Sequence, residues 1–330
     1  MGPKLSIIIV NWNTNEHLRR CIDSIYGAGS ANTYEIIVVD NNSVEDVRAS
    51  LNAYPSVKVI RNQSNTGFAV ANNIGFAHSR GEYLMTLNPD TIVSENMVDS
   101  LISELDADPT VGIVFPKLTG ESVGPSQFTF SYLFFPSIIW RNFRVRYFEP
   151  ATSGAGEPFD VDFFGGTGYA CRRAALPPDH FFVEDNFLFG EEYYLCRYVR
   201  EKGFKIRVVP TATLEHHTSV TFKTDHQRLA VATKLGAAVA WKIRNEEWGR
   251  LKGHIVGLLL LFENVFLFLI LKSMGFIRRK NQIGRSLMVT RCKAMASASV
   301  NLILHGDKYR VHLNKRAKSF LNSRTETEKR

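Results

Sequence analysis

Leu84-Met85-Thr86-Leu87-Asn88-Pro89-Asp90 is the segment of this 330-residue chain from which its fold is most readily predicted. Its largely apolar start predicts a buried strand, and Pro89 ends that strand because proline has no amide proton to give to a neighbouring strand. Asp90 is thereby delivered to the carboxyl end of a sheet, where open α/β sheets bind ligands. A carboxylate there suits Mg²⁺ or Mn²⁺ carrying a diphosphate, since these ions take oxygen ligands and share them with substrate phosphates. Asn-Pro-Asp is also ordinary turn chemistry, and that alternative stays open at this point.

The segments around this stretch alternate between strand and helix. Short runs rich in β-branched and apolar residues predict strands, and apolar residues at helical spacing predict helices. The strands are expected at Leu5–Val10, Tyr34–Val39, Val57–Ile60, Tyr83–Leu87 and Val111–Val114, and the helices at Glu16–Tyr26, Phe68–His78 and Met97–Leu105. Such alternation favours an α/β fold with a mostly parallel sheet and helices on both faces.

Polar side chains follow four of these strands at the point where each strand ends. They are Asn11 and Asn13, Asp40, Arg61, and Asn88 with Asp90. Because the carboxyl ends of parallel strands meet at one edge of a sheet, we expect a polar crevice large enough for a nucleotide. No G-x-G-x-x-G follows the first strand and no G-x-x-x-x-G-K-[ST] occurs in the sequence. The chain is therefore not expected to be a dinucleotide-dependent dehydrogenase or a P-loop enzyme.

The alternation fails between Leu118 and Pro158, where an aromatic and basic segment, Phe128–Phe148, lies among glycines and prolines. This segment could stack on sugar rings or contact a membrane, or it could be an amphipathic cover for the sheet. Val161–Arg173 then predicts a strand, a glycine turn and a strand. Gly166 in that turn would let backbone approach a ligand closely, with a simple hairpin as the alternative.

Two adjacent carboxylates, Glu191 and Glu192, begin the next predicted helix, Glu191–Lys202. Carboxylates at a helix N-terminus are stabilised by the helix dipole, which gives the pair a purely structural explanation. Their mutual repulsion and hydrophobic flanks should nevertheless raise the pKa of one of them, as a general base near neutral pH requires. Further on, a strand at Ile206–Val209 leads to His216 and His217. Neighbouring residues of a strand point to opposite faces, so only one of the two histidines is expected to face the site.

The composition is that of a globular chain, with 45% hydrophobic and 22% charged residues and four scattered cysteines. The absence of Cys-x-x-Cys spacing and of a cleavable leader predicts reduced thiols in a cytosolic chain. The net charge is +8, but the part from Lys272 onward carries 15 Lys and Arg against 3 Asp and Glu, whereas residues 1–271 carry 25 against 29. A basic tail that follows a hydrophobic stretch indicates an anionic membrane surface more than nucleic acid.

That hydrophobic stretch, Ile255–Leu271, is 17 residues long and is interrupted by Glu263 and Asn264. A spanning helix needs about 20 apolar residues, and a central charge costs about 3 kcal/mol. We therefore expect an interfacial helix or a re-entrant hairpin bent near Glu263, with a buried core or oligomer helix as the alternative. Ser319–Arg330 is polar and is expected to be disordered.

Four blocks of the sequence resemble glycosyltransferase family 2, in its bacterial rhamnosyltransferase-like form. The blocks are Val10–Asn13, Val38–Ser43, Asn65–Gly75 and Leu87–Asp90, within roughly the first 120 residues. The resemblance implies the GT-A fold, a Rossmann-like sheet that binds a nucleotide sugar.

The resemblance also implies roles for residues at the donor site. By position, Asp40 resembles the residue that hydrogen-bonds a pyrimidine base, Asn65 and Gly67 resemble the loop near the donor, and Asp90 the last acid of the metal-binding D-x-D. Asn11, Asn13, Arg61, Asn88 and Gly166 are grouped with the same nucleotide-sugar site. Asn88 departs from the acid usual at the first place of D-x-D. Asp40 could instead cap the following helix, and Asn65 and Gly67 could form only a turn and an N-cap.

On the acceptor side, Glu192 resembles the second acid of the family's Glu-Asp-x-Asp-Leu motif, which deprotonates the acceptor hydroxyl, with Glu191 as its competitor. Tyr194 stands where a further acid is usual. Relatives carry a histidine near the metal and diphosphate, which favours His216, with His217 not excluded.

The resemblance thus implies an inverting glycosyltransferase that moves a sugar, with L-rhamnose from dTDP-rhamnose favoured, to a lipid-linked acceptor of a bacterial surface glycan. It would use Mg²⁺ or Mn²⁺ at the cytoplasmic face of the inner membrane. The predicted parts are a donor half, 1–120, an acceptor half, 121–225, and a helical membrane-associating extension, 226–330. The alternatives are a UDP-hexose donor and a non-catalytic nucleotide-binding scaffold. Nucleic-acid binding is disfavoured by the acidic balance of residues 1–271.

Overall fold

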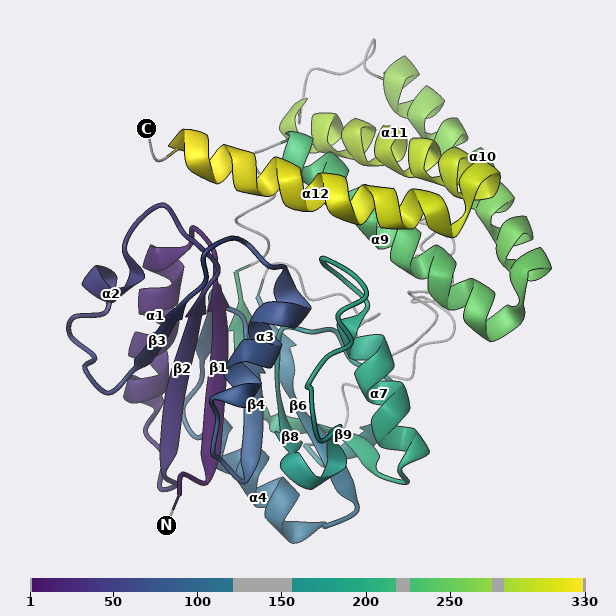
Figure 1. Ribbon diagram of the computed structural model, residues 1–330. Helices are drawn as coiled ribbons and strands as arrows, with labels where there is room; N and C mark the ends of the chain where they lie inside the picture. The colour runs from purple at the N-terminus through teal and green to yellow at the C-terminus, as the bar shows by residue number, and fades with distance from the viewer. Residues whose placement is uncertain (1, 121–155, 218–225, 275–281, 329–330) are drawn as a thin grey trace.

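The computed structural model describes residues 2–120, 156–217, 226–274 and 282–328, which form an α/β domain with a group of long helices above it (Figure 1). The aromatic segment Phe128–Phe148 lies outside the described residues. The first part of the α/β domain comprises β1 (Leu5–Asn11), α1 (Asn15–Ala28), β2 (Tyr34–Asp40), α2 (Val47–Ser50), β3 (Lys58–Arg61), α3 (Phe68–Ala77), β4 (Tyr83–Leu87), β5 (Thr91–Val93), α4 (Met97–Ala107) and β6 (Val111–Thr119). It continues with β7 (Phe159–Val161), β8 (Gly168–Arg172), α7 (Glu191–Glu201) and β9 (Lys205–His216). The helices above are α9 (His226–Trp248), α10 (Arg250–Met274), α11 (Gln282–His305) and α12 (Asp307–Glu328).

Within the described residues the strands form one sheet in the order β3-β2-β1-β4-β8-β6-β9-β5, with β7 added beside β9. The strands β1 to β4 are mutually parallel, so their carboxyl ends share one edge, which confirms the predicted α/β class. The far half is mixed, because β8 runs antiparallel between β4 and β6. The hairpin alternative for Val161–Arg173 is wrong, since β7 pairs with β9 and β8 with β4 and β6.

The parallel strands are apolar on both faces because helices cover both. In β2, Ile37 and Val39 pack with Ala71 of α3 on one face. Ile36 and Val38 belong to the main core on the other face, which also includes buried residues of α1 and α4. Burial on both faces explains why these strands are continuous hydrophobic runs rather than alternating ones.

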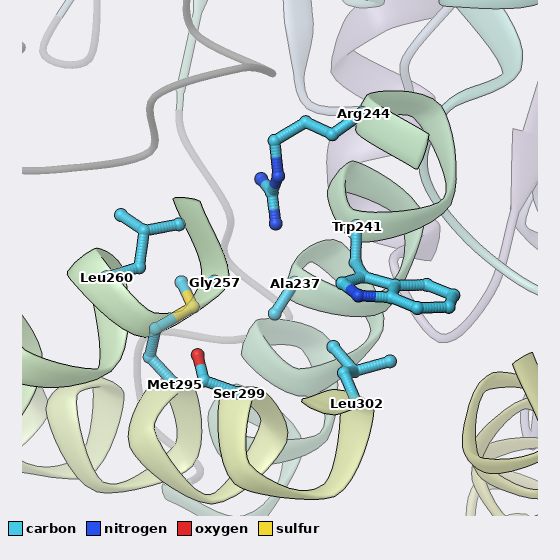
Figure 2. Close-up of a pocket in the computed structure, with 8 residues that line it drawn as sticks. All are labelled: Ala237, Trp241, Arg244, Gly257, Leu260, Met295, Ser299 and Leu302. Atoms are coloured by element: carbon cyan, nitrogen blue, oxygen red, sulfur yellow. The ribbon is translucent and has the colours of Figure 1, made fainter. Parts of the chain in front are cut away.

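Above the sheet, α10 is one continuous helix of 25 residues, so the re-entrant hairpin bent near Glu263 is wrong. Asn264 is buried and its side-chain amide donates to the Leu260 carbonyl at 2.7 Å. A cavity of about 10 Å³, the size of a single water, lies among α9, α10 and α11, with Arg244 beside it (Figure 2). The expected disorder of Ser319–Arg330 is also wrong as far as Glu328, since α12 continues to that residue.

Candidate active site

A cavity of about 400 Å³ lies at the carboxyl edge of the sheet. The helices α9 and α12 are on the side of the sheet toward which this edge faces (Figure 1). It contains eight of the residues singled out from the sequence, namely Asn65, Gly67, Asn88, Asp90, Gly166, Glu191, Glu192 and His216. The structure therefore brings the predicted metal and base residues to one place, together with four of the eight predicted donor residues. That is the arrangement that an α/β sheet provides when neighbouring strands end side by side.

Asp90 and His216 form a close pair in this cavity. Asp90 Oδ1 lies 3.5 Å from His216 Nε2. The pair forms because β5 runs antiparallel to β9, which places Thr91 directly opposite His216, and because the His217 amide donates to the Asp90 carbonyl at 3.0 Å. The His217 side chain lies instead near Glu215, half exposed, at 3.4 Å. Of the two histidines, His216 is the one that faces the cavity.

Glu192 packs directly against the backbone of Gly166. A Cβ at position 166 would collide with Glu192 Oε1, so only glycine leaves room for the carboxylate there. Asn88 fixes this turn from the other side, since its amide nitrogen donates to the Gly166 carbonyl at 3.3 Å and its backbone N–H to the Thr167 carbonyl at 2.9 Å. Asn88 thus supports the turn on which the carboxylate rests.

Both carboxylates of the pair are shifted toward the protonated form. Burial raises the pKa of Glu192 to about 7. Burial, followed by the nearby charge of Glu192, raises the pKa of Glu191 well above its usual range. The direction is the one that the sequence predicts for a group that can accept a proton near neutral pH.

The segment before α7 lines the cavity through Phe187–Phe189 and adopts an unusual backbone. Phe189 and Gly190 both have positive φ, at 75° and 91°. A Cβ at Gly67 would lie 2.5 Å from the Phe187 carbonyl oxygen, and that oxygen accepts a hydrogen bond from the Phe68 amide at 3.1 Å. The donor-side loop and the segment before the carboxylates are therefore held against each other.

The remaining predicted residues lie outside the cavity lining. Asp40 is fully buried, pairs with Arg61 Nη1 at 3.2 Å and accepts from the Ser43 amide at 3.0 Å. Asn11 is also fully buried and donates to Asn15 Oδ1 at 2.9 Å. Asn13 lines a neighbouring hollow of about 370 Å³ at the start of α1. In this structure, Asp40 thus holds the turn after β2, whereas the N-cap of the following helix, α2, is Asp46, so the helix-cap alternative for Asp40 is wrong.

Sequence reasoning missed several residues of the site. Asn41 donates to Asn65 Oδ1 at 2.9 Å and to the Gly67 carbonyl at 3.2 Å, and its own Oδ1 accepts from the Thr66 amide at 3.0 Å. It therefore shapes the donor-side loop, and its signals in the sequence were the polar run after β2 and its place in the block Val38–Ser43. The lining residues that were not among the predicted site residues are Val10, Trp12, Thr14, Asn41, Phe68, Pro89, Thr167 and Phe187–Phe189. Most lie in irregular segments, where no periodic pattern marks them.

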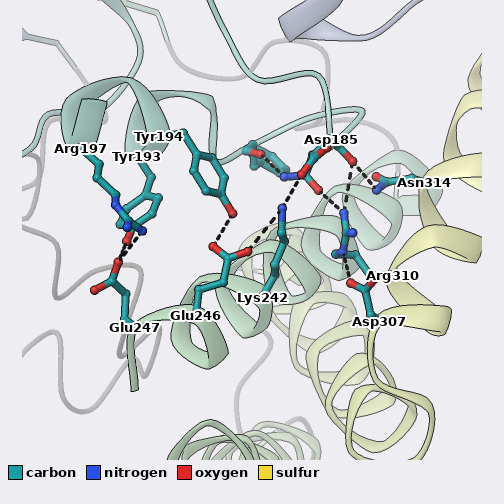
Figure 3. A network of polar contacts seen from close by, with 12 residues as sticks. Asp185, Tyr193, Tyr194, Arg197, Lys242, Glu246, Glu247, Asp307, Arg310 and Asn314 are labelled. Carbon is teal, nitrogen blue, oxygen red and sulfur yellow. Dashed lines mark hydrogen bonds and ion pairs between the residues drawn. The ribbon is translucent and has the colours of Figure 1, made fainter. Parts of the chain in front are cut away.

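Tyr194, which occupies the place of an expected acid, has a packing role. Its hydroxyl donates to Glu246 Oε2 of α9 at 3.0 Å, and Lys242 Nζ lies 5.0 Å from the centre of its ring. Next to it, the Tyr193 hydroxyl donates to Glu247 (Figure 3). Position 194 thus helps to fix α7 to α9 beside the cavity.

The fold is the GT-A fold of solved glycosyltransferases. The solved mannosyltransferase from Pyrobaculum calidifontis, a complex with GDP-Man and Mn²⁺, superposes with a TM-score of 0.58 and 15% identity over 92% of this chain and 88% of that one. Residues 6–167 match the family model Glycosyl transferase family 2. They form a family 2 glycosyltransferase domain, which confirms the resemblance found in the sequence.

Curated relatives agree with this assignment. Glycosyltransferase GlyG of Streptococcus pneumoniae is 31% identical over 34% of this chain, and the match spans only 39% of that relative's length. The N-acetylglucosaminyl-diphospho-decaprenol L-rhamnosyltransferase of Mycobacterium tuberculosis is 22% identical over 76% of this chain and 88% of its own.

Proposed function

We propose that this protein is an inverting glycosyltransferase that transfers a sugar from a nucleotide donor to a hydroxyl group, with Glu192 as the general base. The main support for this proposal is the close contact of the Glu192 carboxylate with the Gly166 backbone. This contact lies in the cavity that Asp90 and His216 also line. The acceptor oxygen forms a bond to the anomeric carbon as the bond from that carbon to the diphosphate breaks. The proton goes to Glu192, and the electron pair leaves with the nucleoside diphosphate.

Asp90 and His216 are the residues that would hold a divalent cation. Among the residues that the structure describes, no group of three or more His, Cys, Asp or Glu is placed to hold a metal ion. A two-residue site still fits, because Mg²⁺ is commonly bound through one or two protein groups together with substrate phosphates and water. A bound Mg²⁺ or Mn²⁺ would neutralise the charge that develops on the departing diphosphate.

We take L-rhamnose from dTDP-rhamnose as the favoured donor and a lipid-linked glycan as the acceptor. The support is the similarity to the mycobacterial L-rhamnosyltransferase, whose named substrate is a diphospho-decaprenol. A UDP-hexose is the alternative donor, since another relative, from Bradyrhizobium diazoefficiens, is an N-acetylglucosaminyltransferase at 24% identity. Because nucleotide sugars are cytosolic, the cavity would face the cytoplasm.

A thermal-shift panel tests donor binding. We expect dTDP-rhamnose with Mn²⁺ to raise the Tm of the full chain more than UDP-hexoses do, because a ligand that binds only the folded state stabilises it by about 2.7 kcal/mol at 100 times its Kd. Release of dTDP from the same donor in the presence of membrane extract tests turnover. A donor that shifts Tm without any release of dTDP would favour the non-catalytic scaffold.

We further propose that α10 attaches the protein to the cytoplasmic face of the membrane. The segment Arg250–Ile270 has a mean hydropathy of 2.1 over 21 residues, so it is longer than the 17-residue stretch predicted from sequence and is long enough to cross a bilayer. Only 22% of that apolar window is buried. The exposed apolar side chains are Leu251, Ile255, Leu258, Leu259, Phe262, Val265, Phe266 and Leu269, which recur at helical spacing along one stripe.

The two polar residues within the apolar stretch of α10, Glu263 and Asn264, are not part of this stripe. Asn264 is buried. Burial, followed by the nearby charge of Glu263, raises the pKa of the Cys292 thiol of α11, so Glu263 lies near that helix. A helix with its apolar side outward and its polar groups toward its neighbours suits a lipid surface. The basic residues that directly follow the apolar stretch in the sequence, Lys272 and Arg278–Lys280, would reach anionic headgroups.

Vesicle flotation tests this attachment. The double variant Leu259→Asn, Phe262→Asn is expected to lower partition into anionic vesicles about 100-fold, since burying each side chain is worth about 1.5 kcal/mol or more and each 1.4 kcal/mol is tenfold. Leu259 and Phe262 are 62% and 70% exposed, so the folded chain should tolerate the change. Tyr26→Asn on α1 is the control. Equal flotation of both variants would contradict a lipid-facing role for α10.

A further inference from the structure

Arg310, in the last helix of the chain, reaches the segment that precedes the two carboxylates. It is 8% exposed. Its Nη1 donates to Asn186 Oδ1 at 3.0 Å and to the Asp185 carbonyl at 3.2 Å, and its Nε donates to Asp307 Oδ1 at 2.6 Å (Figure 3). Asp307 thus orients the guanidinium, whose planar fork suits several simultaneous acceptors. The contact spans more than a hundred residues of sequence.

Asn186 connects Arg310 to the turn at Phe189 and Gly190, because its side chain forms hydrogen bonds with both Arg310 and Phe189. Its amide nitrogen donates to the Phe189 carbonyl at 3.4 Å. Phe189 is a non-glycine residue at φ 75°, a strained conformation that persists only where surrounding contacts hold it. Gly190 and the Glu191-Glu192 pair follow immediately. The path from Arg310 to Glu192 therefore runs through one side chain and one turn.

Neighbouring side chains hold the same segment to the C-terminal helices. Asn314, one turn after Arg310, accepts from the Phe187 amide at 3.2 Å. Lys242 of α9 pairs with Asp185 Oδ2 at 2.5 Å. The first part of this segment is thus contacted by α9 and α12, and the segment lines the cavity through Phe187–Phe189.

We propose that Arg310 is a positioning residue for the transfer reaction. It fixes Asn186, and through it the Phe189-Gly190 turn, so that Glu192 stays on Gly166 where it can accept the acceptor proton. This inference rests on the proposed function, since it assigns Arg310 a role in the reaction of that cavity. The helices after residue 226 then do more than attach the chain to a surface, because one of them completes the base side of the site.

The test compares Arg310→Met with Arg316→Met in the full chain, both on α12. Met keeps the length and apolar stem of Arg310 but has no hydrogen-bond donors. Because a misplacement of about 1 Å can cost 10²-fold in rate, we expect Arg310→Met to lower kcat about 10- to 100-fold while the donor KM changes less than about threefold. Arg316 is exposed, so Arg316→Met should match the wild type.

Two further variants separate positioning from general loss of structure. Arg310→Lys keeps one cationic donor and should recover part of kcat, and Asn186→Ala should reproduce the Arg310→Met defect. The double variant Arg310→Met, Asn186→Ala should be no worse than either single variant, since both act on one path. A kcat for Arg310→Met within twofold of Arg316→Met, or fully additive losses in the double variant, overturns the proposal. If wild type and Arg316→Met release no nucleoside diphosphate from any donor, the proposed function itself fails.

Discussion

Glu192→Gln is expected to lower kcat for sugar transfer by about 10²- to 10⁴-fold, because an amide cannot accept the proton of the acceptor hydroxyl. The substitution keeps the length of the side chain and its seat on Gly166. Donor binding, followed by thermal shift, should change little. Release of nucleoside diphosphate with acceptor present measures the effect, and Glu201→Gln, an exposed carboxylate of the same helix paired with Arg197, is the matched control.

Glu191→Gln decides between the two neighbouring carboxylates. If it loses as much activity as expected for Glu192→Gln while Glu192→Gln remains active, the base is Glu191. The pH profile gives a second criterion. Burial raises the pKa of Glu192 to about 7, with Glu191, Tyr169 and Cys196 as its titratable neighbours. A base works only when deprotonated, so wild-type kcat should rise between about pH 6 and 8 and then level off.

Asp90→Asn is expected to lower kcat at least 10²-fold, because a neutral amide is a poor ligand for the cation that would neutralise the leaving diphosphate. Chelation by EDTA should abolish turnover by the wild type, and added Mn²⁺ should restore it. The same addition should not rescue Asp90→Asn. His216→Ala should show a related loss, with His217→Ala as the control, since the His217 side chain lies near Glu215 instead. Turnover undiminished by EDTA would contradict this assignment of Asp90.

Local sequence patterns were sufficient to predict the strands of the parallel half of the sheet. The strand Tyr83–Leu87 was predicted with its observed bounds, since Pro89 ends it through a rule that acts within a few residues. The far half depends on pairings between distant segments. The three-residue strand β5 exists because Thr91 lies opposite His216, a partner far along the chain, and no pattern within β5 marks it.

The candidate site was predictable where a side chain projects from an element's end into the cavity, as Asp90, His216 and Glu192 do. The site could not be predicted where polar side chains of the same types form hydrogen bonds within their own loop. Asp40 follows a strand just as Asn88 does, yet its carboxylate is occupied by Arg61 and the Ser43 amide. Sequence identifies strand ends, but it does not tell which polar groups are taken up by turns.

The length of the hydrophobic stretch was underestimated for a related reason. Counting apolar residues alone begins the segment at Ile255, whereas the helix begins at Arg250. Glu263 and Asn264 were treated as a break, but a helix can turn two polar residues toward its neighbours and keep its other side apolar. Only the packing of α10 on α11 shows which side that is.

The contact between α12 and the Asp185–Phe189 segment constrains how this protein can be recombined with its relatives. A chimera that takes residues 1–217 from one protein and the C-terminal helices from another would separate Arg310 and Asn314 from Asn186 and Phe187. Grafts should therefore exchange that segment and α12 as a single module, and mismatched hybrids should fold yet work poorly.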